Sequence, residues 1–176
     1  MMKLPDAVRR VSIRFFRMSR ILIVAYGNPD HSDDGLAWEA AEELSERVAS
    51  PEVELITRHR LTPELADDLG GKDVAIFISA ARSGEPGDLT CAPVVAESEN
   101  IYSHQLSPAG VLALAQELDG IAPKAFSICL SGQCFDPGEN LSERVESVLP
   151  TLIALVEQLV SQILRESEPP SFNLPV

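Results

Sequence analysis

Two neighbouring acids, Asp33 and Asp34, are the residues whose type and position best suit chemistry. They lie in an acidic turn, residues 27–34, between an apolar run and an amphipathic segment. A carboxylate just before a helix accepts hydrogen bonds from the free N–H groups of the first turn and complements the helix dipole. Each such carboxylate stabilises the helix by about 0.3–1 kcal/mol. Because one cap needs only one acid, we expect Asp33 to cap the helix and Asp34 to project toward solvent or a ligand.

Histidines supply the next candidates. His104 lies three residues before a helix start expected at Ser107, in a loop expected at the same edge of the sheet as Asp34. An imidazole facing a carboxylate suits a borderline divalent metal such as nickel or zinc, although a lone loop histidine is also typical of an ordinary surface position. We interpret His59, at the end of an expected strand, as solvated, and His31 as a weak further ligand candidate.

Composition excludes several classes of partner. The net charge of −13, from 27 acids against 14 bases, repels nucleic-acid phosphates and anionic lipid. No uninterrupted apolar run approaches the roughly 20 residues that a membrane span needs. Neither GxGxxG nor GxxxxGK occurs, and the acids of residues 27–34 would repel phosphate, so nucleotide binding is not expected. The three cysteines form no CxxC pair and are expected to be free thiols in a reducing cytoplasm: Cys91, Cys129 and Cys134.

Short apolar runs alternate with amphipathic segments along the chain. Strands are expected at residues 21–26, 53–57, 74–79, 90–95 and 125–130, and helices after residue 34, from Thr62-Pro63, from Ser107-Pro108 and over 141–164. The first helix has an apolar stripe and so does the one from Ser107; their members are Leu36, Ala40, Ala41, Leu44 and Val48, and Val111, Leu112, Leu114, Ala115 and Leu118. This order predicts an α/β fold with three layers, a mostly parallel twisted sheet with helices on both faces.

Such sheets bind ligands beyond the carboxyl ends of their strands, near a switch in strand order. We therefore expect the site to be formed by the loops after residues 26, 79 and 130 and by the loop leading into Ser107.

The chain is expected to hold one domain, residues 18–165. Residues 1–17 form a basic N-terminal extension with five basic residues against one acid, which we interpret as preceding the native start at Met18. A transit peptide or a surface-seeking amphipathic helix are the alternatives for this segment. Residues 166–176 contain three prolines and are expected to be a disordered tail.

Several motifs, taken in order, resemble a known family. Residues 21–29, Ile-Leu-Ile-Val-Ala-Tyr-Gly-Asn-Pro, followed by Asp33-Asp34-Gly35, resemble the opening signature of the [NiFe]-hydrogenase maturation endopeptidases. The likeness continues through Leu-Thr-Pro-Glu-Leu-Ala, Arg-Ser-Gly-Glu-Pro-Gly, Ser-His-Gln-Leu-Ser-Pro and Phe-Asp-Pro-Gly-Glu-Asn-Leu-Ser, at residues 61–66, 82–87, 103–108 and 135–142. Each motif alone is weak, whereas the ordered set is specific.

The resemblance implies a cytoplasmic peptidase that trims the C-terminal extension of a hydrogenase large-subunit precursor after nickel insertion. Members carry no metal of their own and recognise the nickel that is bound to the precursor. They use an acid in the first turn, an aspartate ending the third strand and a histidine, which fall here on Asp34, Ser79 and His104. The attacking water could be activated by a carboxylate or by the metal.

Serine at position 79 departs from the family pattern, because a neutral hydroxyl is a poor ligand for a divalent metal. Three explanations are open. The protein cleaves with a weakened site helped by Glu85 or Asp88, which is our working hypothesis, or it has become a binding or checkpoint factor for the large subunit. The third is a Ser79–His104–Asp34 hydrolase, for which no strained nucleophile elbow is present in the sequence.

Overall fold

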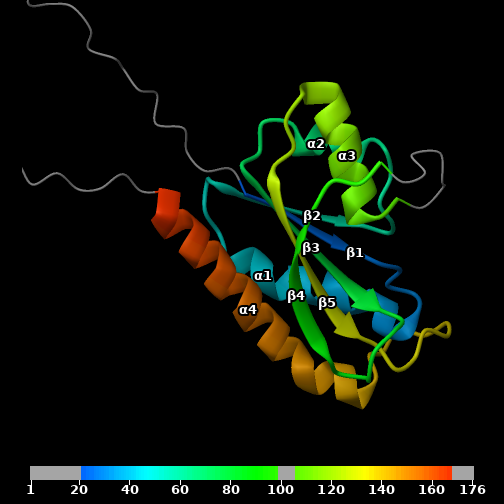
Figure 1. The fold of residues 1–176 in the computed structure, drawn as a ribbon. Helices are drawn as coiled ribbons and strands as arrows, with labels where there is room; N and C mark the ends of the chain where they lie inside the picture. The colour runs from blue at the N-terminus through cyan, green and yellow to red at the C-terminus, as the bar shows by residue number, and fades with distance from the viewer. Residues whose placement is uncertain (1–20, 99–105, 168–176) are drawn as a thin grey trace, which may run out of the picture.

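The computed structural model describes residues 21–98 and 106–167, which form one sheet covered by helices (Figure 1). The expected extension, residues 1–17, and His104 lie outside the described residues, and so does the expected tail apart from its first two residues, which belong to the last helix. In chain order the elements are β1 (Ile21–Tyr26), η1 (Ser32–Gly35), α1 (Leu36–Arg47), β2 (Val53–Arg58), α2 (Leu65–Leu69), β3 (Val74–Ala81), β4 (Leu89–Val94), α3 (Pro108–Asp119), β5 (Lys124–Ser131) and α4 (Glu143–Ser167).

The sheet has the strand order β2-β1-β3-β5-β4. β1, β2, β3 and β5 run parallel, and only the edge strand β4 pairs antiparallel, with β5. The chain passes from β1 to β2 on one side and then crosses to β3 on the other side of β1. The strand order therefore reverses beside the carboxyl end of β1, which is where open α/β sheets bind ligands.

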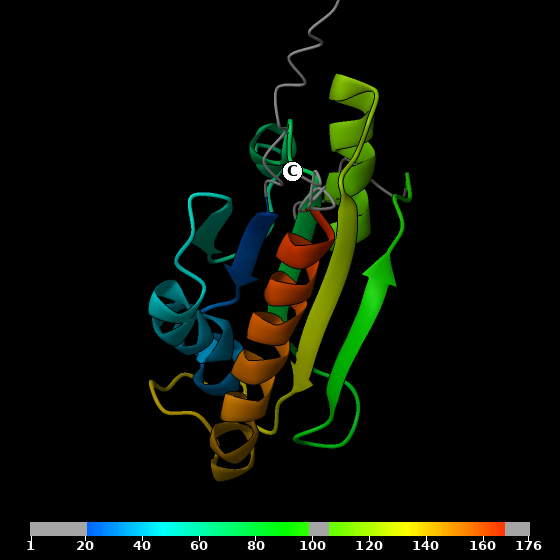
Figure 2. The same cartoon turned by 90° about the vertical axis from the view of Figure 1, so that its left-hand side faces the viewer.

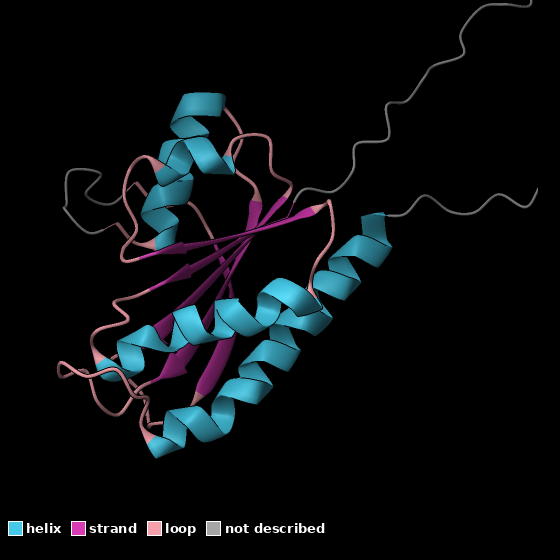
Figure 3. Ribbon diagram, turned by 180° about the vertical axis from the view of Figure 1, so that it is seen from behind, coloured by secondary structure: helices cyan, strands magenta, loops and turns pink. Residues whose placement is uncertain are grey.

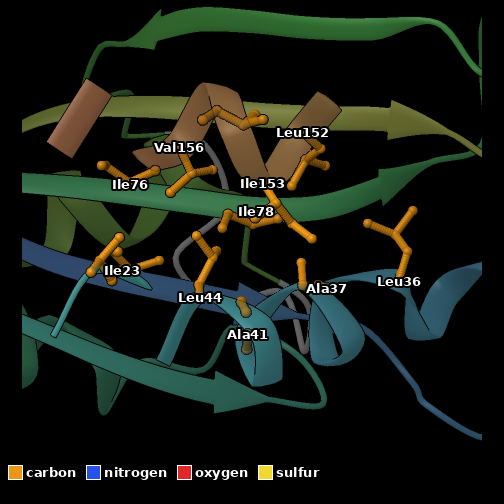
Figure 4. Packing of buried hydrophobic residues seen from close by; sticks show 14 of the residues in the cluster. Ile23, Leu36, Ala37, Ala41, Leu44, Ile76, Ile78, Leu152, Ile153 and Val156 are labelled. Carbon is orange, nitrogen blue, oxygen red and sulfur yellow. The ribbon is translucent and has the colours of Figure 1, made fainter. Parts of the chain in front are cut away.

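The predicted three-layer arrangement is confirmed. Figure 3 shows the sheet between α1 and α4 on one face and α2 and α3 on the other. On the first face the helices and strands interdigitate apolar side chains, among them Leu36, Ala37, Ala41, Leu44, Leu152, Ile153 and Val156 from the helices and Ile23, Ile76 and Ile78 from the strands (Figure 4). Burial of these side chains supplies the main driving force for this packing.

Helix α4 is long and apolar enough, by length and composition, to cross a membrane. It lies along the sheet beside α1 in Figure 2, however, with one stripe of its surface buried at helical spacing. That stripe consists of Val145, Leu149, Leu152, Ile153, Val156 and Val160. Such one-sided burial is typical of an amphipathic helix that packs on the surface of a folded domain.

Two helix predictions need correction. The helix expected from Thr62-Pro63 is assigned only from Leu65, because the amides of Leu65 and Ala66 first form a tight turn to the carbonyls of residues 62 and 63. Leu118 was expected in the buried stripe of α3 but is 60% exposed, since the C-terminal end of α3 projects beyond the sheet (Figure 1). The start of α3 is as predicted: the Ser107 hydroxyl accepts a hydrogen bond from the Gly110 amide at 3.1 Å.

Candidate active site

The turn after β1 folds back so tightly that it needs a glycine at its start. Gly27 has φ +150°, and a Cβ atom there would lie 2.1 Å from the carbonyl oxygen of Asp34. Asp34 belongs to η1, and its Oδ2 accepts a hydrogen bond from the Asn28 amide at 2.9 Å. These contacts hold the Asp34 carboxylate at the carboxyl end of β1.

Asp33 has a different role from the helix cap that we expected. Neither η1 nor α1 has a side-chain cap, and the Asp33 carboxylate is fully buried beneath the loop after β5. It accepts hydrogen bonds from the amides of Gln133 (2.7 Å), Cys134 (2.8 Å) and Ser142 (2.6 Å) and from the Ser142 hydroxyl (2.8 Å). The cap prediction is therefore wrong, because these donors outcompete the amides of the adjacent helix.

Electrostatics agree with an ionised Asp33. Burial by itself would raise the pKa of this carboxyl group, but the hydrogen bonds from Cys134, Ser142 and Gln133 outweigh burial and hold the pKa below its ordinary value of 3.8. The carboxylate thus ties the turn after β1 to the loop after β5 and to the start of α4.

Further contacts join the same two loops. The ring Nδ1 of His31 lies 3.2 Å from the carbonyl oxygen of Phe135, and the Ser32 hydroxyl donates to the carbonyl of Asp136 at 3.0 Å. The Ser32 amide also donates to the carbonyl of Gly138 at 2.7 Å, which stabilises Ser32 at φ +46°. His31, our weak ligand candidate, is therefore engaged with the loop and does not line the pocket described next.

A pocket of about 240 Å³ opens at the carboxyl ends of β1 and β3, beside the reversal in strand order. Asp34 and Ser79 both line it, so the structure brings together two of the three predicted site residues. The complete lining is Tyr26, Gly27, Asp34, His59, Arg60, Leu61, Ser79, Ala80, Arg82 and Leu106.

Comparison with known proteins finds solved structures with a similar fold. No protein-family model and no curated protein sequence matches the chain. Among solved structures, the [NiFe] hydrogenase maturation protease HycI from Thermococcus kodakarensis KOD1 shares 26% sequence identity, with a TM-score of 0.64 over 81% of this chain and 93% of that one. The chain is thus similar in fold and in sequence to the [NiFe] hydrogenase maturation proteases.

Two further structures of this family have the same fold. The hydrogenase maturating endopeptidase HybD from E. coli aligns with a TM-score of 0.66 and 24% identity, over 84% of this chain and 93% of that chain. The [NiFe] hydrogenase maturation protease HybD from Thermococcus kodakarensis aligns with a TM-score of 0.62 and 22% identity, over 80% and 99%.

Ser79, where the family resemblance leads one to expect aspartate, is 6% exposed and already engaged. Its hydroxyl lies 3.6 Å from the Cys129 sulfur on β5 and shares a hydrogen bond with Tyr26. Burial raises the pKa of the Tyr26 hydroxyl and the Ser79 hydrogen bond lowers it only in part, while Cys129 and Asp34 raise it further. Tyr26 therefore remains a neutral partner of Ser79 at physiological pH.

Two suggestions about position 79 gain no support from this geometry. No imidazole among the residues that the structure describes forms a hydrogen bond with Ser79, as a serine nucleophile requires. Glu85 and Asp88, considered as substitutes for the missing acid, do not line the pocket. Asp88 instead closes its own loop, where its carboxylate accepts from the Glu85 amide at 3.2 Å.

His59 is a pocket residue that sequence reasoning placed in solvent. Its side chain is exposed, but it lines the same pocket as Asp34, and its ring packs against Trp38 with centroids 5.1 Å apart. His59 directly follows β2, a strand that is parallel to β1. The rule that parallel strands end at one edge of a sheet could have identified it.

Two arginines give the pocket its positive side. Arg60 and Arg82 line it together with Asp34, and the Arg82 guanidinium lies 4.2 Å from the ring centroid of Phe135. Phe135 belongs to the loop that Asp33 anchors, so this cation–π contact connects that loop to Arg82, the residue directly after β3.

Proposed function

We propose that this protein is a cytoplasmic endopeptidase that removes the C-terminal extension of a [NiFe]-hydrogenase large-subunit precursor after nickel insertion. One observation carries the proposal: a chain similar to these maturation proteases presents the Asp34 carboxylate to an open pocket at the reversal in strand order. Nickel belongs to the precursor in this proposal, and the protein needs no metal of its own.

The geometry of Asp34 suits contact with a metal that arrives with a partner. The Asn28 amide fixes Oδ2, whereas Oδ1 accepts no hydrogen bond from any residue that the structure describes. A carboxylate held in this way offers a charged oxygen to nickel bound by the cysteines of the precursor. An empty metal site gives Asp34 nothing to coordinate, so trimming waits for nickel loading.

The metal also places the reaction. Nickel held against Asp34 brings the adjoining segment of the precursor to the pocket, where its scissile bond lies near the metal. Positioning of this kind converts a slow encounter with water into a local reaction. The water is activated by a carboxylate or by the nickel itself.

Mass spectrometry of the large subunit tests the proposal. The purified protein is incubated with nickel-loaded and nickel-free forms of a precursor from the same organism. We expect shortening of the loaded form only, and expect Asp34→Asn and His104→Ala to abolish it. Asp30→Asn is the matched control, because Asp30 is an exposed acid of the same turn that does not line the pocket. Normal trimming by both site variants would refute the proposal.

Ser79 favours a second candidate function, a checkpoint factor that binds the nickel-loaded large subunit without cutting it. The hydroxyl is engaged by Tyr26 and Cys129 and supplies no charge. The same incubation separates the two functions, because a checkpoint factor forms a complex in which the precursor keeps its full mass. If the site is a weakened peptidase, Ser79→Asp speeds cleavage.

A further inference from the structure

We propose that His59 is a second nickel-contacting residue of this site and compensates for the carboxylate that is absent at Ser79. The inference rests on the proposed recognition of nickel in the precursor. It assigns a role to a residue outside the three positions that the family resemblance picks out.

Strand pairing places His59 beside the acidic turn. β1 and β2 are parallel and pair Tyr26 with Arg58, so the residues that follow them, Gly27 and His59, leave the sheet side by side. The Gly27 amide donates to the carbonyl of Arg58 at 3.1 Å, which secures this register at the last pair. Gly27 in turn lies against Asp34, and all three residues line one pocket.

Trp38 orients the imidazole of His59. The two rings are 5.1 Å apart at an interplanar angle of 59°, and the indole N–H of Trp38 donates to the carbonyl of Gly27 at 2.8 Å. The indole is therefore fixed to the same turn that holds Asp34. The imidazole packs against the indole ring, and neither imidazole nitrogen forms a hydrogen bond with a residue that the structure describes.

The chemistry of the described pocket residues favours His59 over the other side chains. Nickel accepts imidazole nitrogen readily, whereas the Ser79 hydroxyl and the neutral Tyr26 phenol are poor ligands. The two arginines repel a cation. Asp34 and His59 thus form the pair of described pocket residues suited to nickel, one through oxygen and one through nitrogen. His59 is also exposed, as contact with a metal carried by another protein requires.

His59→Phe tests this role, because phenylalanine keeps a ring against Trp38 and removes both nitrogens. His31→Gln is the matched control: it removes an imidazole outside the pocket and leaves an amide that can donate to the carbonyl of Phe135. We expect kcat/KM on the nickel-loaded precursor to fall at least about tenfold in His59→Phe, with an unchanged melting temperature. Wild-type kcat/KM in His59→Phe would overturn the inference and leave the proposed peptidase standing.

Binding separates failure of this inference from failure of the peptidase proposal. The dissociation constant is measured for the nickel-loaded and the nickel-free precursor. This measurement does not require that the protein cleaves the precursor. We expect the wild type and His31→Gln to prefer the loaded form and His59→Phe to lose at least about tenfold of that preference. If the wild type never cleaves but shows this pattern, the peptidase proposal fails and the role of His59 is supported. An equal preference in His59→Phe and wild type, or no preference in the wild type, overturns it.

Discussion

Replacing Asp33 should destabilise the loops around the pocket, although Asp33 itself does not line the pocket. Its fully buried carboxylate accepts four hydrogen bonds, from Gln133, Cys134 and twice from Ser142, at 2.6–2.8 Å. Asp33→Ala leaves three amides and one hydroxyl without this acceptor. A buried donor left unpaired costs about 1–3 kcal/mol. Because the hydroxyl can rotate and water can reach part of the opened loop, we expect a total loss of about 3–5 kcal/mol.

Urea unfolding followed by circular dichroism measures this loss as a lower midpoint at an unchanged slope. Asp34→Ala is the matched control, since it removes one hydrogen bond, from Asn28, at the edge of an open pocket. Its expected cost in unfolding free energy is about 1 kcal/mol. The two adjacent acids should therefore have different effects, with the stability of the fold depending on Asp33 and processing of the precursor depending on Asp34. A loss below about 1 kcal/mol in Asp33→Ala would refute our account of the buried carboxylate.

Three further predictions concern the same turn. The lowered pKa of Asp33 stabilises the fold fully above the ordinary value of 3.8, and this contribution is lost as pH falls through the folded-state pKa. In the wild type, the free energy of unfolding measured in urea should be lower below pH 3 than at pH 5. In Asp33→Asn, which has no titrating carboxyl group at this position, this pH-dependent difference should be smaller. Gly27→Ala should cost at least about 2 kcal/mol and abolish processing, because its Cβ would lie 2.1 Å from the Asp34 carbonyl; a wild-type urea midpoint would contradict this. Asp34→Asn should lower the raised pKa of Tyr26, because the substitution removes a neighbouring negative charge. Ultraviolet titration measures this pKa, with Tyr26→Phe identifying the signal of Tyr26.

Local patterns were sufficient to predict most of the fold. The apolar run of residues 21–26 became β1 at the predicted bounds, and the stripe from Leu36 to Val48 became the buried face of α1. Ser107 caps α3 as its type and the following proline indicate. In each case the deciding interactions join residues a few positions apart, so the signal lies within a short window of sequence.

The site was predictable only in part. Asp34 and Ser79 reach one pocket because parallel strands end at the same edge of a sheet, a rule that needs no coordinates. The same rule applied to β2 would have brought in His59, which was instead interpreted as solvated. The predicted role of His104 stays a prediction, since that residue lies outside the described residues.

The sequence by itself determined the order of the elements, the edge of the sheet that carries the site and the acid that faces the pocket. Tertiary structure alone decided what the neighbouring acid does, because the donors to Asp33 lie 100 to 109 residues further along the chain. It also decided that Tyr26 and Cys129 engage Ser79 and that Trp38 supports His59. These roles depend on which distant segments meet, and the type of an isolated residue does not encode that.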